Sequence, residues 1–253
     1  MCLAVIAHDA HPAFPLIVAA NRDEFHARLT AAAAWWPQGI FAGRDLSAGG
    51  TWFGVRRDGR IALLTNYRDG SPRDPLARSR GELVVSALRS VQLPNGSLRA
   101  LVADGDRYQG FNLVTGTAGD LHCASNRSPG VVVLESGIFG LSNHLLDSPW
   151  PKVERTKARI ADVLRDDIVT PAAMLEVLDD RTPASDDELP DTGIGLERER
   201  FLSSPFIVGE RYGTRSSSVL LVGGDGRVRF VERTFDPAGN TMGEIDESFR
   251  LAA

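Results

Sequence analysis

The chain is poor in cysteine and has no long apolar run. Only two of its 253 residues, Cys2 and Cys123, are cysteines. Two thiols cannot build the disulfide framework of a small secreted protein, and a reducing compartment is the simpler inference. No apolar run approaches the roughly 18 residues of a membrane-spanning helix. The apolar start at residues 3–7 is too short and lacks the basic lead of a signal peptide. We therefore expect a cytoplasmic protein without a transmembrane segment.

Basic charge and metal-site spacings are also lacking. Asp and Glu (33) outnumber Lys and Arg (28), which gives a formal net charge of −5. Nucleic acid and anionic membranes both reward a basic excess, so we expect neither as a partner. The histidines His8, His11, His26, His122 and His144 have no zinc-site spacing, so no metal site is predicted. They matter only as candidate haem ligands, and surface or hydrogen-bonded histidines are the simpler interpretation.

The chain does contain enough apolar material for a sizeable core. Hydrophobic residues make up 43% of it, and we expect a single domain over residues 1–253. Short apolar runs alternate with turn signals such as Asp58-Gly59, which is typical of hairpins. The predicted hairpins join residues 3–7 to 16–20, 49–55 to 60–65, 111–115 to 121–125, and 216–222 to 227–234, with one more short strand at 138–141.

Helical spacing is found between groups of these strands. Residues 81–91 predict an amphipathic helix that Pro94-Asn95-Gly96 stops, and residues 152–164 predict another that begins after Pro151. Residues 171–178 predict a third helix, the acidic stretch 183–192 a solvated loop, and residues 31–37 give no clear prediction. This order favours an α+β protein in which helices cover two antiparallel sheets packed face to face.

Cys2 has the anatomy of an N-terminal nucleophile. Once Met1 is removed, this residue carries a thiol and a free α-amine. The thiolate attacks acyl carbons well, and the α-amine has a reference pKa of about 7.7–8.0, close to working pH. Small side chains at position 2 permit removal of Met1. If Met1 is retained, the amine is an ordinary amide and Cys2 is a plain thiol.

Short motifs occur in a fixed order along nearly the whole chain. They are Met1-Cys2, Ala20-Asn21-Arg22-Asp23-Glu24, Gly49-Gly50-Thr51-Trp52, Leu64-Thr65-Asn66-Tyr67, Arg80-Gly81-Glu82-Leu83, Gly110-Phe111-Asn112-Leu113, Gly140-Leu141-Ser142-Asn143 and Tyr212-Gly213-Thr214-Arg215. From Met1 to about Glu232 the chain resembles the NRDE family, also called the Transport and Golgi organisation protein 2 family. The resemblance implies a four-layer αββα fold like that of N-terminal nucleophile hydrolases. It also implies a cysteine amidohydrolase-like N-terminus, and links to haem trafficking and to lipid or acyl-CoA handling.

A more distant similarity is to cysteine N-terminal nucleophile enzymes of the bile salt hydrolase and penicillin V acylase kind. Their Arg-Asn-x-Asp motif corresponds to Ala20-Asn21-Arg22-Asp23, in which Ala20 replaces the leading arginine and Arg22 lies two positions later, at the variable place. Arg22 therefore departs from the pattern. The similarity also relates their strand-end asparagine to Asn66, their Thr-Asn-Ser-Pro segment to Ser142-Asn143, and their late Ser-Arg to Thr214-Arg215.

These residues suggest an amidase site with Cys2 as nucleophile. Asp23 would orient the α-amine, Arg22 or Arg215 would favour the thiolate, and Asn66 or Asn143 would donate to the oxyanion. Asn21 belongs to the same motif. The predicted reaction hydrolyses a linear amide or acyl bond through a thioester and requires no cofactor.

Plainer interpretations stand beside this hypothesis. Cys2 can be a small apolar residue that opens a strand, and residues 21–24 a turn with surface ion pairs. Asn66 and Asn143 can be strand-end turn residues, Arg215 an ion-pair partner, and Cys123 a buried, inert thiol. The alternative function is a carrier for haem or a lipidic acyl compound, with Trp35, Trp36 and Trp52 as walls of the same cleft. A scaffold role is a weaker third option.

Overall fold

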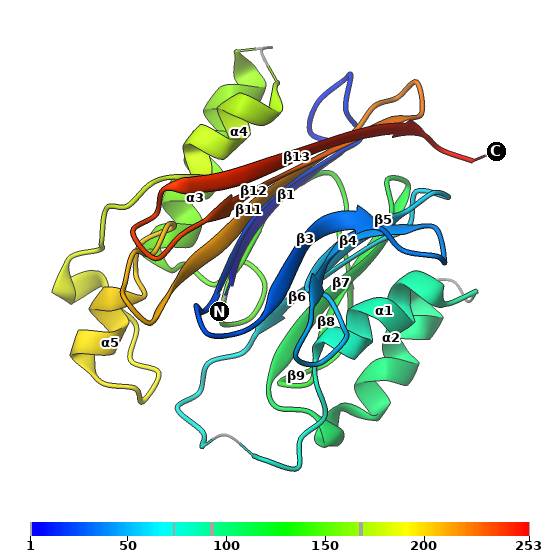
Figure 1. Ribbon diagram of the computed structural model, residues 1–253. Helices are drawn as coiled ribbons and strands as arrows, with labels where there is room; N and C mark the ends of the chain where they lie inside the picture. The colour runs from blue at the N-terminus through cyan, green and yellow to red at the C-terminus, as the bar shows by residue number, and fades with distance from the viewer. Residues whose placement is uncertain (1, 73, 92–93, 167–168, 253) are drawn as a thin grey trace.

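Two antiparallel sheets pack face to face in this protein, as the sequence predicts (Figure 1). The computed structural model describes residues 2–72, 74–91, 94–166 and 169–252. Within these residues, sheet A has the strand order β10-β1-β2-β11-β12-β13. Its strands are β1 (Cys2–His8), β2 (Leu16–Phe25), β10 (Gly137–Leu141), β11 (Tyr212–Val222), β12 (Arg227–Phe235) and β13 (Thr241–Arg250).

Sheet B follows the chain from one edge to the other, in the order β3-β4-β5-β6-β7-β8-β9. Its strands are β3 (Thr30–Trp35), β4 (Ile40–Asp45), β5 (Phe53–Arg56), β6 (Ile61–Asn66), β7 (Phe111–Thr117), β8 (Asp120–Ser125) and β9 (Ser128–Val133). Sequential antiparallel neighbours can be joined by hairpin turns. The exception is the pair β6 and β7, whose connection spans residues 67–110 and contains helices.

Helices cover the outer faces of both sheets, which completes four αββα layers (Figure 1). Helices α1 (Gly81–Arg89) and α2 (Pro94–Ala103) contact sheet B, whereas α3 (Pro151–Arg165) and α4 (Pro171–Leu178) contact sheet A. A short helix α5 (Leu196–Phe201) and two 3-10 turns, Gly105–Arg107 and Asp186–Glu188, lie in connections. The predicted fold class is therefore confirmed.

The alternation of side chains along β1 and β2 divides the core into layers. Ala4 and Ile6 point into the space between the sheets, whereas Val5 and Ala7 point toward α3 and α4. Successive strand residues face opposite sides, so this alternation fixes which side each polar residue at the strand ends can reach. The space between the sheets is filled mainly by aliphatic side chains, and Phe230 packs there against Phe41 and Phe53.

The predicted hairpins and the three predicted helices are present, with one error of interpretation. Pro94-Asn95-Gly96 does not only follow α1, which ends at Arg89; it begins helix α2. Proline is well tolerated in the first turn of a helix, because that N–H has no intrahelical acceptor. Residues 31–37, left without a prediction, contribute most of β3. The prediction also missed β4, β9, β13 and α5.

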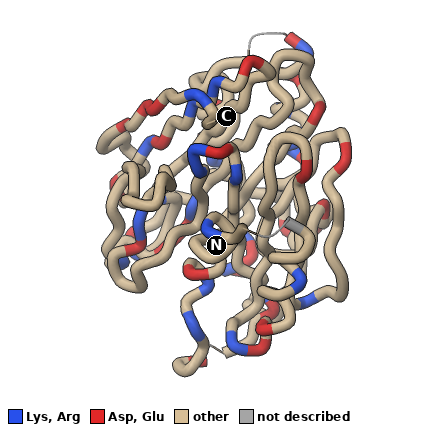
Figure 2. The backbone as a smooth tube through the Cα atoms, turned by 90° about the vertical axis from the view of Figure 1, so that its right-hand side faces the viewer, with Lys and Arg blue, Asp and Glu red and all other residues tan. Residues whose placement is uncertain are grey.

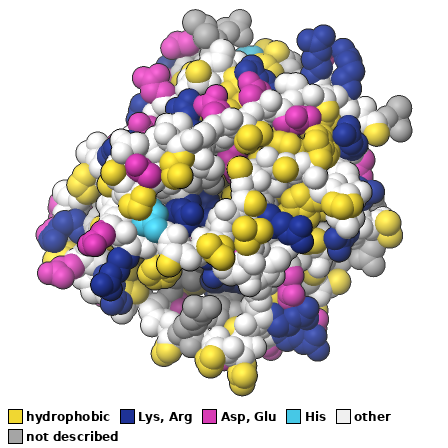
Figure 3. Space-filling view, in the orientation of Figure 1, with side chains coloured by type: hydrophobic (Ala, Val, Ile, Leu, Met, Phe, Trp, Pro, Cys, Tyr) yellow, Lys and Arg dark blue, Asp and Glu magenta, His cyan; other side chains and the backbone are white. Residues whose placement is uncertain are grey.

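Charged side chains of both signs are spread over the molecule. Figure 2 shows Lys and Arg interspersed with Asp and Glu along the chain, and Figure 3 shows the same mixture on one face. Ion pairs such as Arg229–Asp246 (2.6 Å) tie the outer strand β13 to β12. None of the helices in the described ranges is long and apolar enough to cross a bilayer.

Gly43 on β4 is a position where the packing between the sheets should tolerate no side chain. A Cβ there would lie 2.5 Å from two ring carbons of Trp52. We expect Gly43→Ala to lower the free energy of unfolding by about 1–3 kcal/mol through overpacking, measured by urea titration. Gly119→Ala is the matched control, because its Cβ would meet nothing within 4 Å. Equal stability of the two variants would contradict this account of the packing.

Candidate active site

Cys2 is the first residue of β1 and lies half-buried at the end of sheet A. It pairs directly with Arg22 of β2. The hydroxyl of Ser142, just after β10, donates a hydrogen bond to the Cys2 carbonyl (2.9 Å). Cys2 is therefore fixed from both neighbouring strands, while Met1 lies outside the described residues.

The motif residues after β2's apolar run divide between the two faces of sheet A. Arg22 points between the sheets, where its guanidinium carbon lies 4.1 Å from the centre of the Trp52 ring. Asn21 points to the helix side, where its amide donates to the carbonyls of Leu178 and Pro205 (2.9 Å each). Asn21 and Arg22 point to opposite faces because successive side chains of a strand alternate between its two sides. Cys2 and Arg22 are directly opposite, so they share the face between the sheets.

Asp23 is buried next to Cys2 and held by β11. The Thr214 hydroxyl donates to its carboxylate (2.7 Å), and the Tyr212 hydroxyl donates to its backbone carbonyl (3.1 Å). Burial raises the pKa of this carboxyl, whereas the charge of Lys152 and the Thr214 hydrogen bond act in the opposite direction. The Asp23 backbone N–H acts to lower the pKa of Cys2 and so favours the thiolate.

Burial dominates the electrostatics of the Cys2 thiol. It raises the pKa of Cys2, and the carboxylate of Asp23 raises it further. The positive charge of Arg22 acts in the opposite direction. At neutral pH the resting group is therefore the thiol, and a nucleophilic Cys2 needs a base to take its proton.

Lys152 is a member of this site that the sequence did not reveal. It lies in the first turn of α3 and is only 2% exposed. Its Nζ donates to the carbonyl of Leu202 (3.0 Å). Burial lowers the pKa of Lys152 to about 8, and the charges of Asp23 and Cys2 partly offset that shift. From sequence alone, a lysine in the first turn of an amphipathic helix is expected to be exposed to solvent. Only the tertiary structure shows that Lys152 is buried.

A buried ion pair lies close to Lys152. Arg68 and Glu199 of α5 are joined at 2.8 Å, and both side chains are almost fully buried. The Arg68 guanidinium also lies 4.5 Å from the centre of the Trp150 ring. The charges of Arg68 and Glu199 both act on the pKa of Lys152. Asp23, Lys152, Arg68 and Glu199 thus form a charge network on the helix side of Cys2.

The two predicted oxyanion donors, Asn66 and Asn143, are neighbours, but only one of them has a side-chain amide that is already hydrogen-bonded to a described residue. The side-chain amide of Asn143 donates to the backbone carbonyl of Asn66 (2.9 Å). The backbone carbonyl of Asn143 accepts from the backbone N–H of Arg68 (2.8 Å). These two hydrogen bonds of Asn143 therefore connect the end of β6 to the loop after β10. The side-chain amide of Asn66 makes no hydrogen bond to another described residue, so it is the better available donor.

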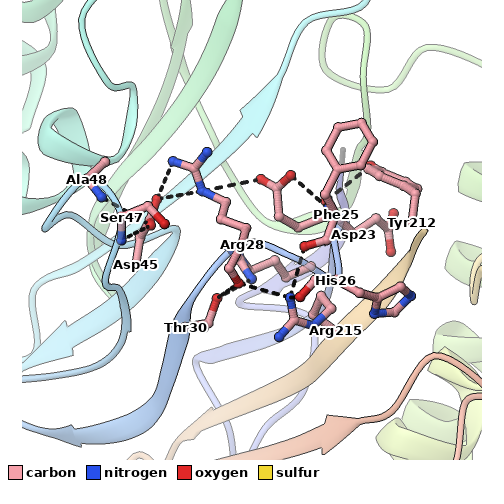
Figure 4. A network of polar contacts seen from close by, with 12 residues as sticks. Asp23, Phe25, His26, Arg28, Thr30, Asp45, Ser47, Ala48, Tyr212 and Arg215 are labelled. Atoms are coloured by element: carbon pink, nitrogen blue, oxygen red, sulfur yellow. Dashed lines mark hydrogen bonds and ion pairs between the residues drawn. The ribbon is translucent and has the colours of Figure 1, made fainter. Parts of the chain in front are cut away.

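Arg215 occupies a bulge of β11 and binds backbone rather than a carboxylate (Figure 4). Its guanidinium donates to the carbonyls of Phe25, His26 and Arg28 at 3.0–3.2 Å. Arg22 is the register partner of Cys2, and its charge acts to lower the pKa of the thiol. Of the two predicted arginines, Arg22 is therefore the one that the strand pairing sets opposite Cys2.

The three tryptophans proposed as cleft walls do not line one cleft. Trp35 and Trp52 pack in the core between the sheets, whereas Trp36 packs on the α1 side of sheet B. Trp36 lines an open hollow of about 390 Å³ together with Gly49, Gly50 and two arginines, Arg44 and Arg89. Gly50 is required there for close packing, because a Cβ would lie 2.5 Å from the backbone of Gly81.

The second thiol, Cys123, is buried, and the histidines are hydrogen-bonded within the protein. Burial raises the pKa of Cys123 to about 12. Each of the five histidine rings takes part in a hydrogen bond. In the described part of the chain, no group of three or more His, Cys, Asp or Glu side chains is placed to hold a metal ion.

Glu232 makes stability depend on pH. Its carboxylate is buried between the sheets and accepts from the N–H of Ala33 (2.7 Å), and burial raises its pKa to about 7. A raised folded-state pKa stabilises the folded protein below pH about 4.5, and this stabilisation is lost as pH rises through about 7. We expect Glu232→Gln to flatten the pH dependence of the free energy of unfolding between these values, by on the order of 3 kcal/mol. Parallel curves for variant and wild type would contradict this assignment.

Solved structures share this arrangement of layers. An N-acylethanolamine-hydrolyzing acid amidase ortholog from Caenorhabditis elegans matches 87% of this chain and 92% of its own, with a TM-score of 0.52 and 10% identity. A variant of conjugated bile acid hydrolase from Clostridium perfringens matches 98% of this chain and 97% of its own, with a TM-score of 0.50 and 8% identity. The fold is therefore that of the N-terminal nucleophile hydrolases.

Sequence comparison defines the family more closely. The model of the Transport and Golgi organisation 2 family matches residues 1–237, and the chain belongs to this family. It is 36% identical to the human Transport and Golgi organization protein 2 homolog over 92% of this chain and 93% of that protein. It is 30% identical to the Drosophila melanogaster protein of that name over 94% and 95%. The family resemblance expected from the motifs is confirmed.

Proposed function

We propose that this chain is a cysteine N-terminal nucleophile hydrolase that cleaves a linear amide or acyl bond after removal of Met1. One observation carries the proposal: Cys2 lies directly opposite Arg22 in the β1–β2 pair, so the two side chains share one face of sheet A. A fixed positive charge favours a thiolate, and the charge of Arg22 acts to lower the pKa of Cys2. The hydrolase-like fold is consistent with this chemistry and does not by itself define it.

The proposed reaction uses the α-amine of Cys2 as its base. The amine takes the thiol proton while sulfur attacks the carbonyl carbon, and the Asn66 amide donates to the resulting oxyanion. The carbon–nitrogen bond then breaks, and the leaving amine takes the proton. Water attacks the thioester and gives up a proton to the same base, and the acid is released as the thiol re-forms. Asp23 orients the amine, and Lys152 partly balances the carboxylate charge of Asp23.

The first test is the mass of the N-terminal peptide of the purified protein, followed by turnover of a panel of linear amides and thioesters. We expect a chain that begins at Cys2, and Cys2→Ala should reduce turnover to the uncatalysed background. Cys123→Ala is the control, because that thiol is buried away from the site, and it should keep full activity. Retention of Met1, or full turnover by Cys2→Ala, would refute the proposal.

Asp23 offers a second test of the same site. Asp23→Asn keeps the size of the side chain but removes its charge, so it should orient and stabilise the protonated amine poorly. We expect kcat to fall by about 10²-fold, which is typical for loss of an acid–base component. Glu24→Gln is the matched control one residue along β2, where the carboxylate contacts Arg28 (3.7 Å) instead. Equal losses in the two variants would show that Asp23 has no special role.

A further inference from the structure

Arg22 is a buried cation that lacks a full counter-ion. Its residue is 5% exposed. Among the described residues, the guanidinium makes one hydrogen bond, to the Thr30 hydroxyl (3.2 Å), and stacks on Trp52. No described carboxylate lies within ion-pair distance of it. A buried charge is costly unless it is paired, and a guanidinium has five N–H donors. Most of the binding capacity of Arg22 is therefore unused.

Ser216 places an unused hydroxyl beside Arg22. It is 4% exposed, and in the described part of the chain its Oγ has no hydrogen-bond partner. Cys2 pairs with Arg22, and Arg22 pairs in turn with Ser216 across β2 and β11. Directly opposed residues of antiparallel strands point to the same face. Cys2, Arg22 and Ser216 thus form one row between the sheets, and the row presents hydrogen-bond donors next to the nucleophile.

The charge of Arg22 acts to lower the pKa of both nearby carboxyls, those of Glu232 and Asp23, but among the described residues neither forms an ion pair with it. Glu232 lies in the next row, opposite Ser218, and is held by the N–H of Ala33 and by the Ser218 hydroxyl (3.4 Å). Its raised pKa, about 7, leaves it only partly ionised near neutral pH. Asp23 lies on the helix side of the sheet with Thr214. Arg215 adds positive charge near Arg22, and its guanidinium is occupied by backbone carbonyls.

We propose that Arg22 and Ser216 form a carboxylate-binding subsite beside Cys2, so that the preferred substrate is an amide or acyl compound carrying a carboxylate close to the scissile bond. A carboxylate is a planar acceptor that matches the guanidinium fork in two parallel hydrogen bonds, and the Ser216 hydroxyl supplies a third donor. The Trp52 ring stacks against one face of the Arg22 guanidinium and leaves its edge for hydrogen bonds. The substrate preference rests on the proposed hydrolase function, whereas the binding itself does not.

Binding to the Cys2→Ala protein tests the subsite without any turnover. The probes are N-acylglycines with acetyl to dodecanoyl chains and the matching N-acylglycinamides, which differ only in replacing the carboxylate with a neutral amide. We expect at least one acylglycine to bind about tenfold or more tightly than its amide by calorimetry, with a preference that weakens at higher salt. No preference anywhere in the series overturns the proposal.

Variants in the Cys2→Ala background then assign the preference to its residues. Arg22→Gln should reduce it to within about twofold, and Ser216→Ala should reduce it by about threefold, with folding checked by circular dichroism. If Arg22→Gln does not fold, Ser216→Ala decides the result. Arg44→Gln is the matched control, because Arg44 also stacks on a tryptophan, Trp36 (4.9 Å), but in the distant hollow. An unchanged preference in Ser216→Ala, or equal loss in Arg44→Gln, overturns the proposal.

The two proposals can fail separately. A carboxylate preference in binding, combined with no turnover by the processed wild-type chain, supports the subsite and rejects the hydrolase. Turnover that depends on Cys2 but does not distinguish charged from neutral substrates, together with equal binding of both probes, rejects the subsite and retains the hydrolase.

Discussion

The antiparallel pairing of β1 with β2 is the constraint on which the whole site depends. Its register sets Cys2 opposite Arg22, and the pleat then sends Arg22 between the sheets and Asp23 toward the helices. A slip of one residue would exchange the two faces and place Arg22 among the apolar side chains under α4. The register is held by apolar residues that alternate between two cores, such as Ala4 and Val5. The packing of the core thus determines which polar side chains lie beside Cys2 at the end of the strands.

The ionisable groups on the helix side of Cys2 stabilise one another. Asp23, Lys152, Arg68 and Glu199 include two charges of each sign, and three of them come from segments that follow β2 by more than 40 residues. Burying any one of them alone would cost several kcal/mol, so they are tolerated as a set. Arg22, on the other face, forms no ion pair with a described member of this set, although its charge acts to lower the pKa of Asp23. The contrast between a neutralised helix side and an unpaired cation on the other side suggests where an anionic group can be accommodated.

The sequence predicted local features well and tertiary features poorly. Hairpins with Asp-Gly or Gly-rich turns and helices with apolar stripes are encoded within about ten residues, and they are found where expected. The mostly exposed strand β13 has no apolar alternation to reveal it, and it is held by its backbone pairing with β12, over which exposed ion pairs lie. At the site, the motifs indicated Cys2 and Asp23. They did not reveal Lys152, Ser216 or Glu232, because each is an ordinary polar residue until a distant strand or helix buries it.

In the proposed hydrolase, the surroundings of Cys2 restrict which group can act as its base. As the first residue of a central strand, it is confined by Arg22 on one side and by the Ser142 hydrogen bond on the other. Burial raises the pKa of the thiol, so Cys2 is protonated at neutral pH and less open to oxidation. The proposed reaction therefore needs a base close to the sulfur. We assign this role to the α-amine of Cys2, and the Asp23 carboxylate would stabilise the protonated amine.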